Sequence, residues 1–417
     1  MAKRDDNIPS TAEDVMTNHA FAKGLYDEAN TASDKVLDML TEGVEIPSDA
    51  PDAGNAMVAQ MVMARALIER MRQMLQVDAS LKPRVMPQKA GEQERERCAK
   101  IERCLKGYDR RHAYETKRNY HRDATFWYLL RGRCVLETRV NRAASKTGQL
   151  PFSTFCDDPN TIFPVRGRSG VLWYTKEYSM FAREAKRAIQ YLKVKQKPEF
   201  PEEPNATVDV VEFYDDKYYA CVFDGKTLVH SVKHDLGFVP MSEGHCMDTP
   251  LEDARWAYQA VIGPVVDHIK LFYILVSKMA TGVNEFYFPR IYYKSISGKP
   301  IVFDPGAVGQ LEEMAPDGKF EVVSPDVNSQ IIGQLLGVIK GDISLMTLPE
   351  TAFGAEPQSL ESGFAVAQVL GQVQSAIADK VPNLARCFAD HYGNLLRMVA
   401  QLGGADGMDL SVPDDLE

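Results

Sequence analysis

Four potential metal ligands lie close together in the sequence: His230, His234, His245 and Cys246. Imidazole nitrogen and thiolate sulfur are the donors that zinc prefers in proteins. The spacing matches no zinc-binding motif, however, and all four residues lie near the ends of predicted strands or in loops. The sequence therefore favours ordinary strand-end residues here over a metal site.

Paired carboxylates, which can carry general acid–base chemistry, occur at three places: Asp157-Asp158, Asp215-Asp216 and Glu312-Glu313. Each pair lies in a predicted turn, and adjacent residues of a strand point to opposite faces, so solvated turns are the favoured interpretation. The chain contains no glycine-rich phosphate loop, no nucleophile elbow and no His-Glu-x-x-His motif. We therefore expect no enzymatic activity and no cofactor.

The chain contains seven cysteines, an odd number, and no C-x-x-C pair. This pattern is typical of free thiols in a reducing compartment rather than of a disulfide framework. The first residues lack the apolar core of a signal peptide. The most apolar segment, 261–280, contains several charged residues, and each mid-span charge costs about 2.5 kcal/mol or more in a membrane. We expect neither secretion nor a membrane span.

The composition of the 417 residues, 45% hydrophobic and 25% charged, is that of a globular protein with two or three domains. The net charge of −10 is unevenly distributed, since residues 82–146 contain 18 Lys and Arg against 8 Asp and Glu. Phosphate contacts need cations, so an acidic chain is a poor general nucleic-acid binder. The basic segment is predicted to form either one face of a subunit interface or solvated helix faces.

Helices and strands alternate in the first 250 residues. Predicted helices cover 10–43, where Ser10 and Glu13 fit a capping box, then 53–77, 92–131 and 181–195. Gly132 is predicted to end the third of these helices, and 157–170 is predicted to be a loop. Alternating and β-branched residues predict strands at 134–140, 171–180, 207–214, 217–223 and 226–232.

The pattern changes near residue 252. One long helix is predicted at 252–281, kinked at Pro264, and its apolar surface is too broad for a single partner helix. Strand and turn signals follow at 283–325, and a second helix at 328–346 carries a row of small residues that permits close helix packing. A loop at 347–363 leads to a helix at 364–402, interrupted near Pro382, and to an acidic tail.

This order of elements resembles the portal proteins of tailed bacteriophages, in which two stem helices flank a small clip domain and a tunnel loop leads into another long helix. The match is carried by Trp256 to Ala280, Phe286 to Val323, Ile331 to Met346, the sequence Leu348-Pro349-Glu350-Thr351-Ala352-Phe353-Gly354 and Ser362-Gly363-Phe364-Ala365. Upstream, Asp158-Pro159-Asn160 and Val208 to Pro240 resemble the wing. One departure is a short or absent crown after Pro382.

The resemblance implies an α+β fold with a mixed α/β wing. It divides the chain into a wing (1–251), a first stem helix (252–282), a clip (283–327), a second stem helix (328–346), a tunnel loop (347–363), an inner wing helix with a short crown (364–403) and an acidic tail (404–417).

Three groups of site residues follow from the pattern and the resemblance. The tunnel loop presents Leu348, Pro349, Glu350, Thr351, Phe353 and Glu356 to DNA. The clip presents Tyr287, Arg290, Tyr292, Tyr293 and Lys294, either for docking or for contacts within the ring. Stem packing uses Ile262, Val265, Ile269, Phe272, Val276, Gly333, Gly337 and Gly341.

The resemblance also implies a function: a ring of twelve subunits at one capsid vertex, the conduit for genome packaging and ejection. The implied partners are the major capsid protein and scaffold, the terminase motor, head-completion adaptor and tail proteins, and double-stranded DNA passing through without sequence specificity. The implied location is the virion, with the host cytoplasm during assembly. The alternative is another virion structural or scaffold-type protein.

Overall fold

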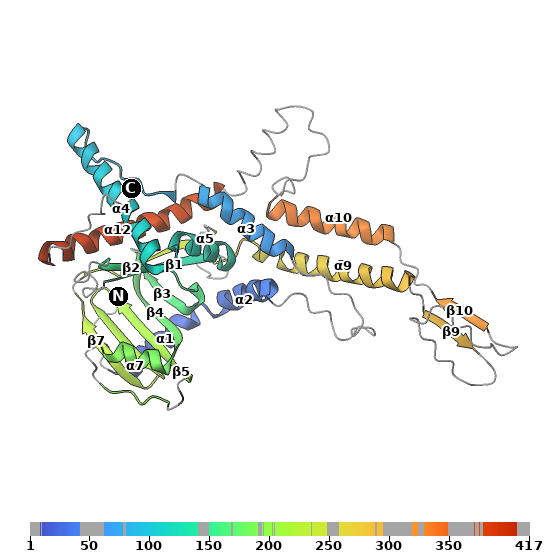
Figure 1. Ribbon diagram of the computed structural model, residues 1–417, viewed down its shortest axis with the longest axis horizontal. Helices are drawn as coiled ribbons and strands as arrows, with labels where there is room; N and C mark the ends of the chain where they lie inside the picture. The colour runs from blue at the N-terminus through green and yellow to red at the C-terminus, as the bar shows by residue number, and fades with distance from the viewer. Residues whose placement is uncertain are drawn as a thin grey trace. The chain divides into compact units, whose positions relative to one another are not determined.

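The computed structural model shows a mixed α+β chain (Figure 1). It forms two compact units, described separately below: unit 1 comprises Met1–Leu37, Leu67–Pro264 and Thr351–Glu417, and unit 2 comprises Asp38–Ala66 and Val265–Glu350. The structure describes residues 9, 11–41, 62–77, 81–140, 150–167, 170–190, 194, 196–201, 203, 205–234, 236–247, 258–287, 290–294, 319–323, 329–348, 371, 375 and 378–406.

The helices that lie wholly or partly in unit 1 are α1 (Ala12–Gly24), α2 (Asp27–Thr41), α3 (Val62–Val77), α4 (Glu92–Thr116), α5 (Tyr120–Arg131), α7 (Ala182–Gln190) and α12 (Lys380–Asp406). Its strands are β1 (Arg133–Val140), β2 (Phe152–Phe155), β3 (Ile162–Gly167), β4 (Gly170–Phe181), β5 (Thr207–Asp215), β6 (Tyr218–Phe223), β7 (Thr227–Lys233) and β8 (Met241–His245). The strands predicted from the sequence are confirmed to within one or two residues.

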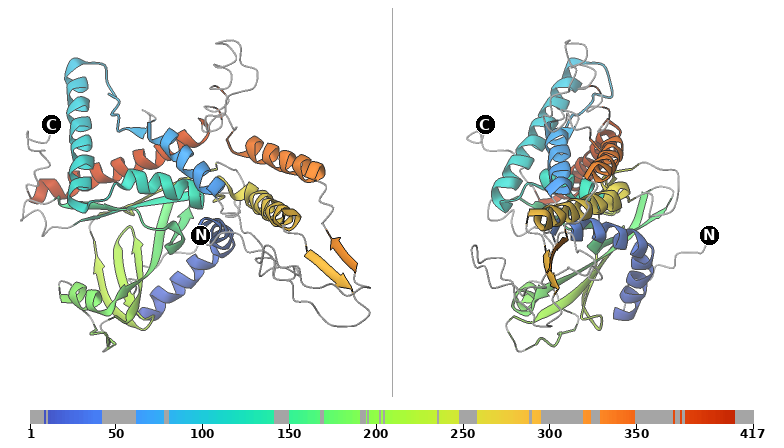
Figure 2. Two further views of the ribbon diagram at one scale, coloured as in Figure 1. Left: turned by 45° about the vertical axis from the view of Figure 1, so that its right-hand side comes forward. Right: turned by 90° about the vertical axis from the view of Figure 1, so that its right-hand side faces the viewer.

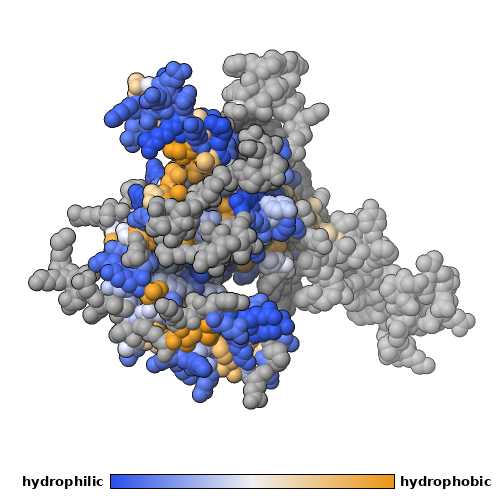
Figure 3. Space-filling model, turned by 60° about the vertical axis from the view of Figure 1, so that its left-hand side comes forward, coloured by the Kyte–Doolittle hydropathy of each residue, from blue (hydrophilic) through white to orange (hydrophobic). Residues whose placement is uncertain are grey.

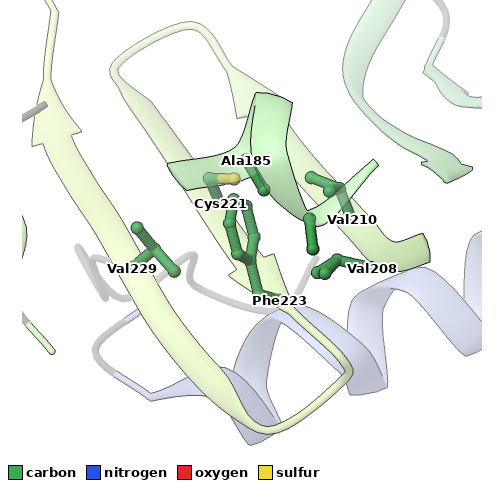
Figure 4. Close-up of a cluster of buried hydrophobic side chains, with 7 residues drawn as sticks. Ala185, Val208, Val210, Cys221, Phe223 and Val229 are labelled. Carbon is green, nitrogen blue, oxygen red and sulfur yellow. The ribbon is translucent and has the colours of Figure 1, made fainter. Parts of the chain in front are cut away.

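A five-stranded antiparallel sheet, in the order β3-β4-β5-β6-β7, is the larger of the two sheets of unit 1. Alternate residues of its strands supply two cores. On one face, Val15 of α1 packs with Val211, Phe213, Ala220, Val222 and Leu228. On the other, Ala182 and Ala185 of α7 pack with Val208, Val210, Cys221, Phe223 and Val229 (Figure 4). The predicted Asp224-Gly225 turn is confirmed by positive φ angles of 48° and 65°.

A second antiparallel sheet, in the order β2-β1-β8, packs against α12 (Figure 2). Cys134 of β1 lies opposite Gly244 of β8, and an added Cβ at Gly244 would lie 2.8 Å from the Cβ of Cys387 on α12. Asn394 of α12 donates a hydrogen bond of 3.2 Å to the carbonyl of Met241. Close backbone packing and polar contacts together hold α12 on this sheet.

Buried ion pairs join the two sheets. Glu137 of β1 accepts hydrogen bonds from Lys176 at 3.0 Å and from Tyr174 at 2.9 Å, while Arg139 pairs with both Glu137 and Glu212. Burial raises the pKa of the Glu137 carboxyl, but the charges of Arg139 and Lys176 lower it more, so it lies well below its ordinary value. Removing one partner would leave a buried charge uncompensated.

The N-terminal helix prediction was wrong in its cap and its length. The helix expected at 10–43 is two helices, because the chain turns at Leu25 and Tyr26 between α1 and α2. The capping box is formed by Thr11 and Asp14 rather than by Ser10 and Glu13. The spacing was right but displaced by one residue, since both pairs satisfy the same pattern.

The helix expected at 92–131 is also interrupted. Lys117 takes a left-handed conformation (φ 56°) that ends α4, and the side chain of Asn119 then caps α5 by accepting hydrogen bonds from the amides of His121 and Arg122. Gly132 ends α5 as expected, with φ 76°. The segment 157–170 is not a loop throughout, because most of it forms a 3₁₀ turn (Pro159–Thr161) and strand β3.

Two prolines lie where helices begin. The interruption expected near Pro382 is confirmed, because a turn at Asp379 separates the helical residue 378 from α12. Pro264 lies in a 3₁₀ turn (Gly263–Val265) that precedes the α-helix, so the expected kink within a helix at 252–281 is wrong. Pro382 lies in the first turn of α12. Proline lacks an N–H group, and the first turn of a helix does not need one.

Gly132 offers a sharp test of the packing. Its φ of 76° is unfavourable for other residues, and an added Cβ would lie 2.3 Å from the carbonyl oxygen of Tyr258. We expect Gly132→Ala to destabilise unit 1 by at least about 3 kcal/mol, from strain and overpacking together. Gly237 has a similar φ of 66° but open space, so Gly237→Ala should cost only about 1 kcal/mol. Equal losses in urea unfolding would contradict the close approach.

His391 of α12 predicts a pH dependence. The ring is fully buried, with its nitrogens 3.3 Å and 3.4 Å from the hydroxyls of Thr138 and Thr154, and burial lowers its pKa from 6.5 to about 3. The unfolded chain binds a proton below pH 6.5 that the folded chain does not, so stability should fall as the pH drops. One such proton contributes a slope of about 1.4 kcal/mol per pH unit.

The measurement is urea unfolding at pH 7, 6 and 5, with His391→Gln beside the natural chain. We expect the variant to be less stable at pH 7 but to have a shallower loss between pH 6 and 5. An identical slope in both chains would show that His391 does not carry it.

Candidate assembly surface on the helical pair

In the second segment of unit 2, one helix precedes a small sheet along the chain and another helix follows it. These are α9 (Val266–Tyr287), β9 (Arg290–Lys294), β10 (Lys319–Val323) and α10 (Ser329–Met346). The strands pair antiparallel, from Arg290 opposite Val323 to Lys294 opposite Lys319. The two helices pack against each other, and no helix among the described residues is long and apolar enough to cross a membrane.

The contact between α9 and α10 has polar edges around apolar side chains. The ammonium of Lys340 lies 5.7 Å from the centre of the Phe272 ring, and His268 lies 4.0 Å from the carboxylate of Asp342. On α10, Ile339 and Ile343 are 3% and 4% exposed and recur one helical turn apart. These residues define the buried side of α10.

The residues proposed for stem packing divide into two groups. Ile262, Val265, Ile269 and Phe272 are buried within the chain itself, and Val276 is half-buried. Substituting Ile269 or Phe272 would therefore test folding first, not assembly. A candidate surface for another subunit is therefore sought elsewhere, among exposed residues.

Such a surface lies on α10. Leu335, Val338 and Leu345 are 42%, 61% and 86% exposed, and their spacing of three and seven residues places them along one side of the helix. We call these three residues the α10 stripe. Exposed apolar side chains in line mark an interaction site more strongly than isolated ones do. The sequence contained this spacing, but the apolar residues of α10 were too numerous to reveal which ones stay exposed.

The glycine row forms another exposed side of α10. Gly333, Gly337 and Gly341 are exposed, and a Cβ added to any of them would have no described atom within 4 Å. Their expected close packing is therefore not made with any described part of this chain. The row leaves the backbone open to close approach by another helix.

The clip residues are found in two elements. Tyr287 is the last residue of α9, so this helix includes the first five residues of the segment that was predicted to be β-rich from 283 onward. Arg290, Tyr292, Tyr293 and Lys294 lie in β9, as expected for a strand. Of the tunnel-loop residues, Leu348 is described and is 2% exposed. The remaining ones lie outside the described residues: Pro349, Glu350, Thr351, Phe353 and Glu356.

No metal centre is present among the described residues, where no group of three or more His, Cys, Asp and Glu could hold an ion. His245 instead lies 2.9 Å from the carboxylate of Glu243, and Cys246 is buried.

The acidic pair at 157–158 was wrongly expected to be a solvated turn. Asp157 accepts from Lys176 at 2.7 Å and Asp158 from Arg131 at 2.8 Å, so each carboxylate pairs with a buried cation. The signal missed was the position of the pair directly before the 3₁₀ turn that leads into β3, where the two carboxylates contact side chains of neighbouring elements. The pair Glu312-Glu313 lies outside the described residues.

Comparison with known proteins adds no relative: no protein-family model matches the chain, and no curated protein matches its sequence.

Neighbouring positions on α10 allow a matched test of its two sides. We expect Ile339→Asp, which places a charge at a 3% exposed position, to destabilise the helical pair by several kcal/mol. Val338→Asp should change stability by less than about 0.5 kcal/mol, because that side chain is 61% exposed. Thermal unfolding and hydrogen exchange of α9 and α10 measure both. A large loss for Val338→Asp in single chains, at concentrations too low for assembly, would mean that the stripe is covered within the chain.

Proposed function

We propose that this chain is the subunit of a bacteriophage portal: a ring at one capsid vertex that serves as the conduit for genome packaging and ejection. The observation that carries the proposal is the order of unit 2, in which a helix, a two-stranded antiparallel sheet and a returning helix follow one another. That order matches the stem–clip–stem pattern in which the sequence resembles portal proteins. The α10 stripe supplies a surface for a neighbouring subunit.

The charge of the second part of the chain supports passage of DNA without capture. Residues 251–417 contain 11 Lys and Arg against 21 Asp and Glu. Cation–phosphate contacts supply most non-specific affinity for DNA, so an acidic lining gives a shallow energy profile along the tunnel. The loop at 347–363 contains no cation and is proposed to form a loose collar around double-stranded DNA.

The ring would also be a docking platform. By the resemblance, its partners are the major capsid protein and scaffold, the terminase motor, and the adaptor and tail proteins that complete the head. It would be assembled in the host cytoplasm and carried in the virion.

Ring formation is the direct test. Native mass measurement should give a species near twelve times the 46.6 kDa of one chain, and negative-stain images should show a central hole. Val338→Asp together with Leu335→Asp should leave mostly single chains, because both residues are exposed and apolar on α10. The control is Gln334→Glu, an exposed polar position on the same helix. A natural chain that stays monomeric at all concentrations would refute the proposal.

The clip allows a separate test of docking. Arg290 and Lys294 are the two cations of β9, and arginine and aromatic residues are enriched among interface hot spots. Charge reversal at both, Arg290→Glu with Lys294→Glu, should weaken terminase or adaptor binding at least tenfold while rings persist. Lys278→Glu, an exposed position on α9, is the control. Loss of the rings instead would assign the two residues to contacts between clips.

A further inference from the structure

A basic hollow of about 640 Å³ lies in unit 1, where α4, α5 and α12 meet the segment that precedes α4. Its lining includes Lys82, Lys106, Arg110 and Arg122, together with the single carboxylate of Asp109 and the ring of Phe388. Four cations therefore surround one concave site against one acid. We call this site the basic hollow.

The one acid in the hollow is already engaged. Asp109 accepts hydrogen bonds from the hydroxyls of Tyr120 and Tyr392, the second at 2.7 Å, and it lies 3.4 Å from Nε2 of His121. A carboxylate with these partners has little capacity left to neutralise cations across the hollow.

The cations are largely uncompensated. Lys106 lies 3.7 Å from Glu102 one turn away on α4, an exposed pair of small energetic weight. Lys82, Arg110 and Arg122 form no ion pair with any described carboxylate, and all three are exposed. Their charges add to a positive potential in a concave site, where low-dielectric walls strengthen the field.

An adjacent hollow of about 710 Å³ provides an internal comparison. It shares Arg122 and is lined by as many acids as cations: Arg72, Lys117, Arg118 and Arg122 against Glu69, Asp123, Asp157 and Asp158. Three of its acids already form ion pairs, with Arg72, Lys176 and Arg131. Counted over the lining residues alone, the excess of cations over acids is therefore three in the basic hollow and zero in the adjacent one. Hydrophilic residues, in blue, predominate among the coloured residues of the face drawn in Figure 3.

The arrangement fits phosphate better than a carboxylate. A phosphate group carries more charge than a carboxylate and has acceptor oxygens directed to several sides, so it can be reached by several cations at once. Two arginine forks and two lysines converge on the hollow from three segments of the chain. The N-terminus of α5 is not counted as an anion-binding site, because the side chain of Asn119 already accepts hydrogen bonds from the amides of His121 and Arg122.

We propose that the basic hollow binds phosphate groups, carried either by a free oligophosphate or by the backbone of a nucleic acid. The site is distinct from unit 2 and does not depend on the portal function. Phe388 adds an apolar wall on one side, beside which a sugar or base attached to the phosphate can pack. Lys82, Lys106 and Arg110 line this hollow and not the adjacent one, and Lys82 and Arg110, which form no ion pair with a described carboxylate, contribute directly to affinity.

The test uses the full chain and three probes: tripolyphosphate, a fluorescent 12-nucleotide DNA as single strand and as duplex, and a glutamate-rich peptide of matched charge. Lys82→Ala with Arg110→Ala removes two charges from the basic hollow. The matched control, Lys117→Ala with Arg118→Ala, removes two charges from the adjacent hollow only. All four positions are exposed, so unfolding temperatures should stay within about 2 °C of each other.

We expect the natural chain to bind tripolyphosphate, the first double variant to lose at least tenfold in affinity, and the control to lose less than threefold. Displacement of labelled DNA by tripolyphosphate would assign the nucleic-acid backbone to the same hollow, and a probe bound only as tripolyphosphate would assign a free oligophosphate. Equal losses in both double variants, no binding of any phosphate probe, or equal affinity for the glutamate peptide would overturn the proposal.

Discussion

The close contact between α12 and the three-stranded sheet is the constraint on which the rest of the chain depends. An added Cβ at Gly244 would lie 2.8 Å from Cys387 Cβ and 3.2 Å from Cys134 Sγ, so three segments meet there without room for a further carbon. Strands β1 and β8 precede the second segment of unit 2, Val265–Glu350, in the sequence, and α12 follows that segment. This contact therefore joins parts of unit 1 that lie before and after the segment Val265–Glu350 in the sequence.

Polar groups buried beside this contact link it to the basic hollow. Tyr392 of α12 and Tyr120 of α5 both donate to Asp109 of α4, and His391 packs edge-on against Tyr120 with ring centres 5.2 Å apart. Asp109 thus serves to fasten three helices, and its negative charge is used inside the protein rather than offered to the surface. The cations Lys82 and Arg110 beside it keep their charge for an outside ligand. The use of Asp109 to hold α4, α5 and α12 together thereby leaves the cations of the basic hollow without a neutralising carboxylate.

The sequence predicted what local patterns control. Five strands of unit 1 followed from alternation, whereas β2, β3 and β8 were not predicted. The Asp224-Gly225 turn followed from the positive φ that Asp-Gly adopts readily. Helix ends were harder to predict. Lysine is not a residue type that favours the left-handed conformation found at Lys117, although Asn119 was a usable capping signal. The sides of α10 could not be assigned at all. Most of Ile331 to Met346 is apolar or small, so only the position of α9 distinguishes buried Ile339 from exposed Val338.

The surface of α10 also bears on the type of assembly. The α10 stripe and the glycine row are two different exposed sides of one helix, and neither is the side that α9 covers. A two-fold dimer uses the same patch on both partners, so it would cover one of these sides and leave the other open. A cyclic ring gives every subunit two neighbours through unlike surfaces, and it can cover the stripe with one neighbour and approach the glycine row with the other. If the chain assembles through α10 as proposed, its two unlike sides therefore suit a closed ring better than a two-fold dimer.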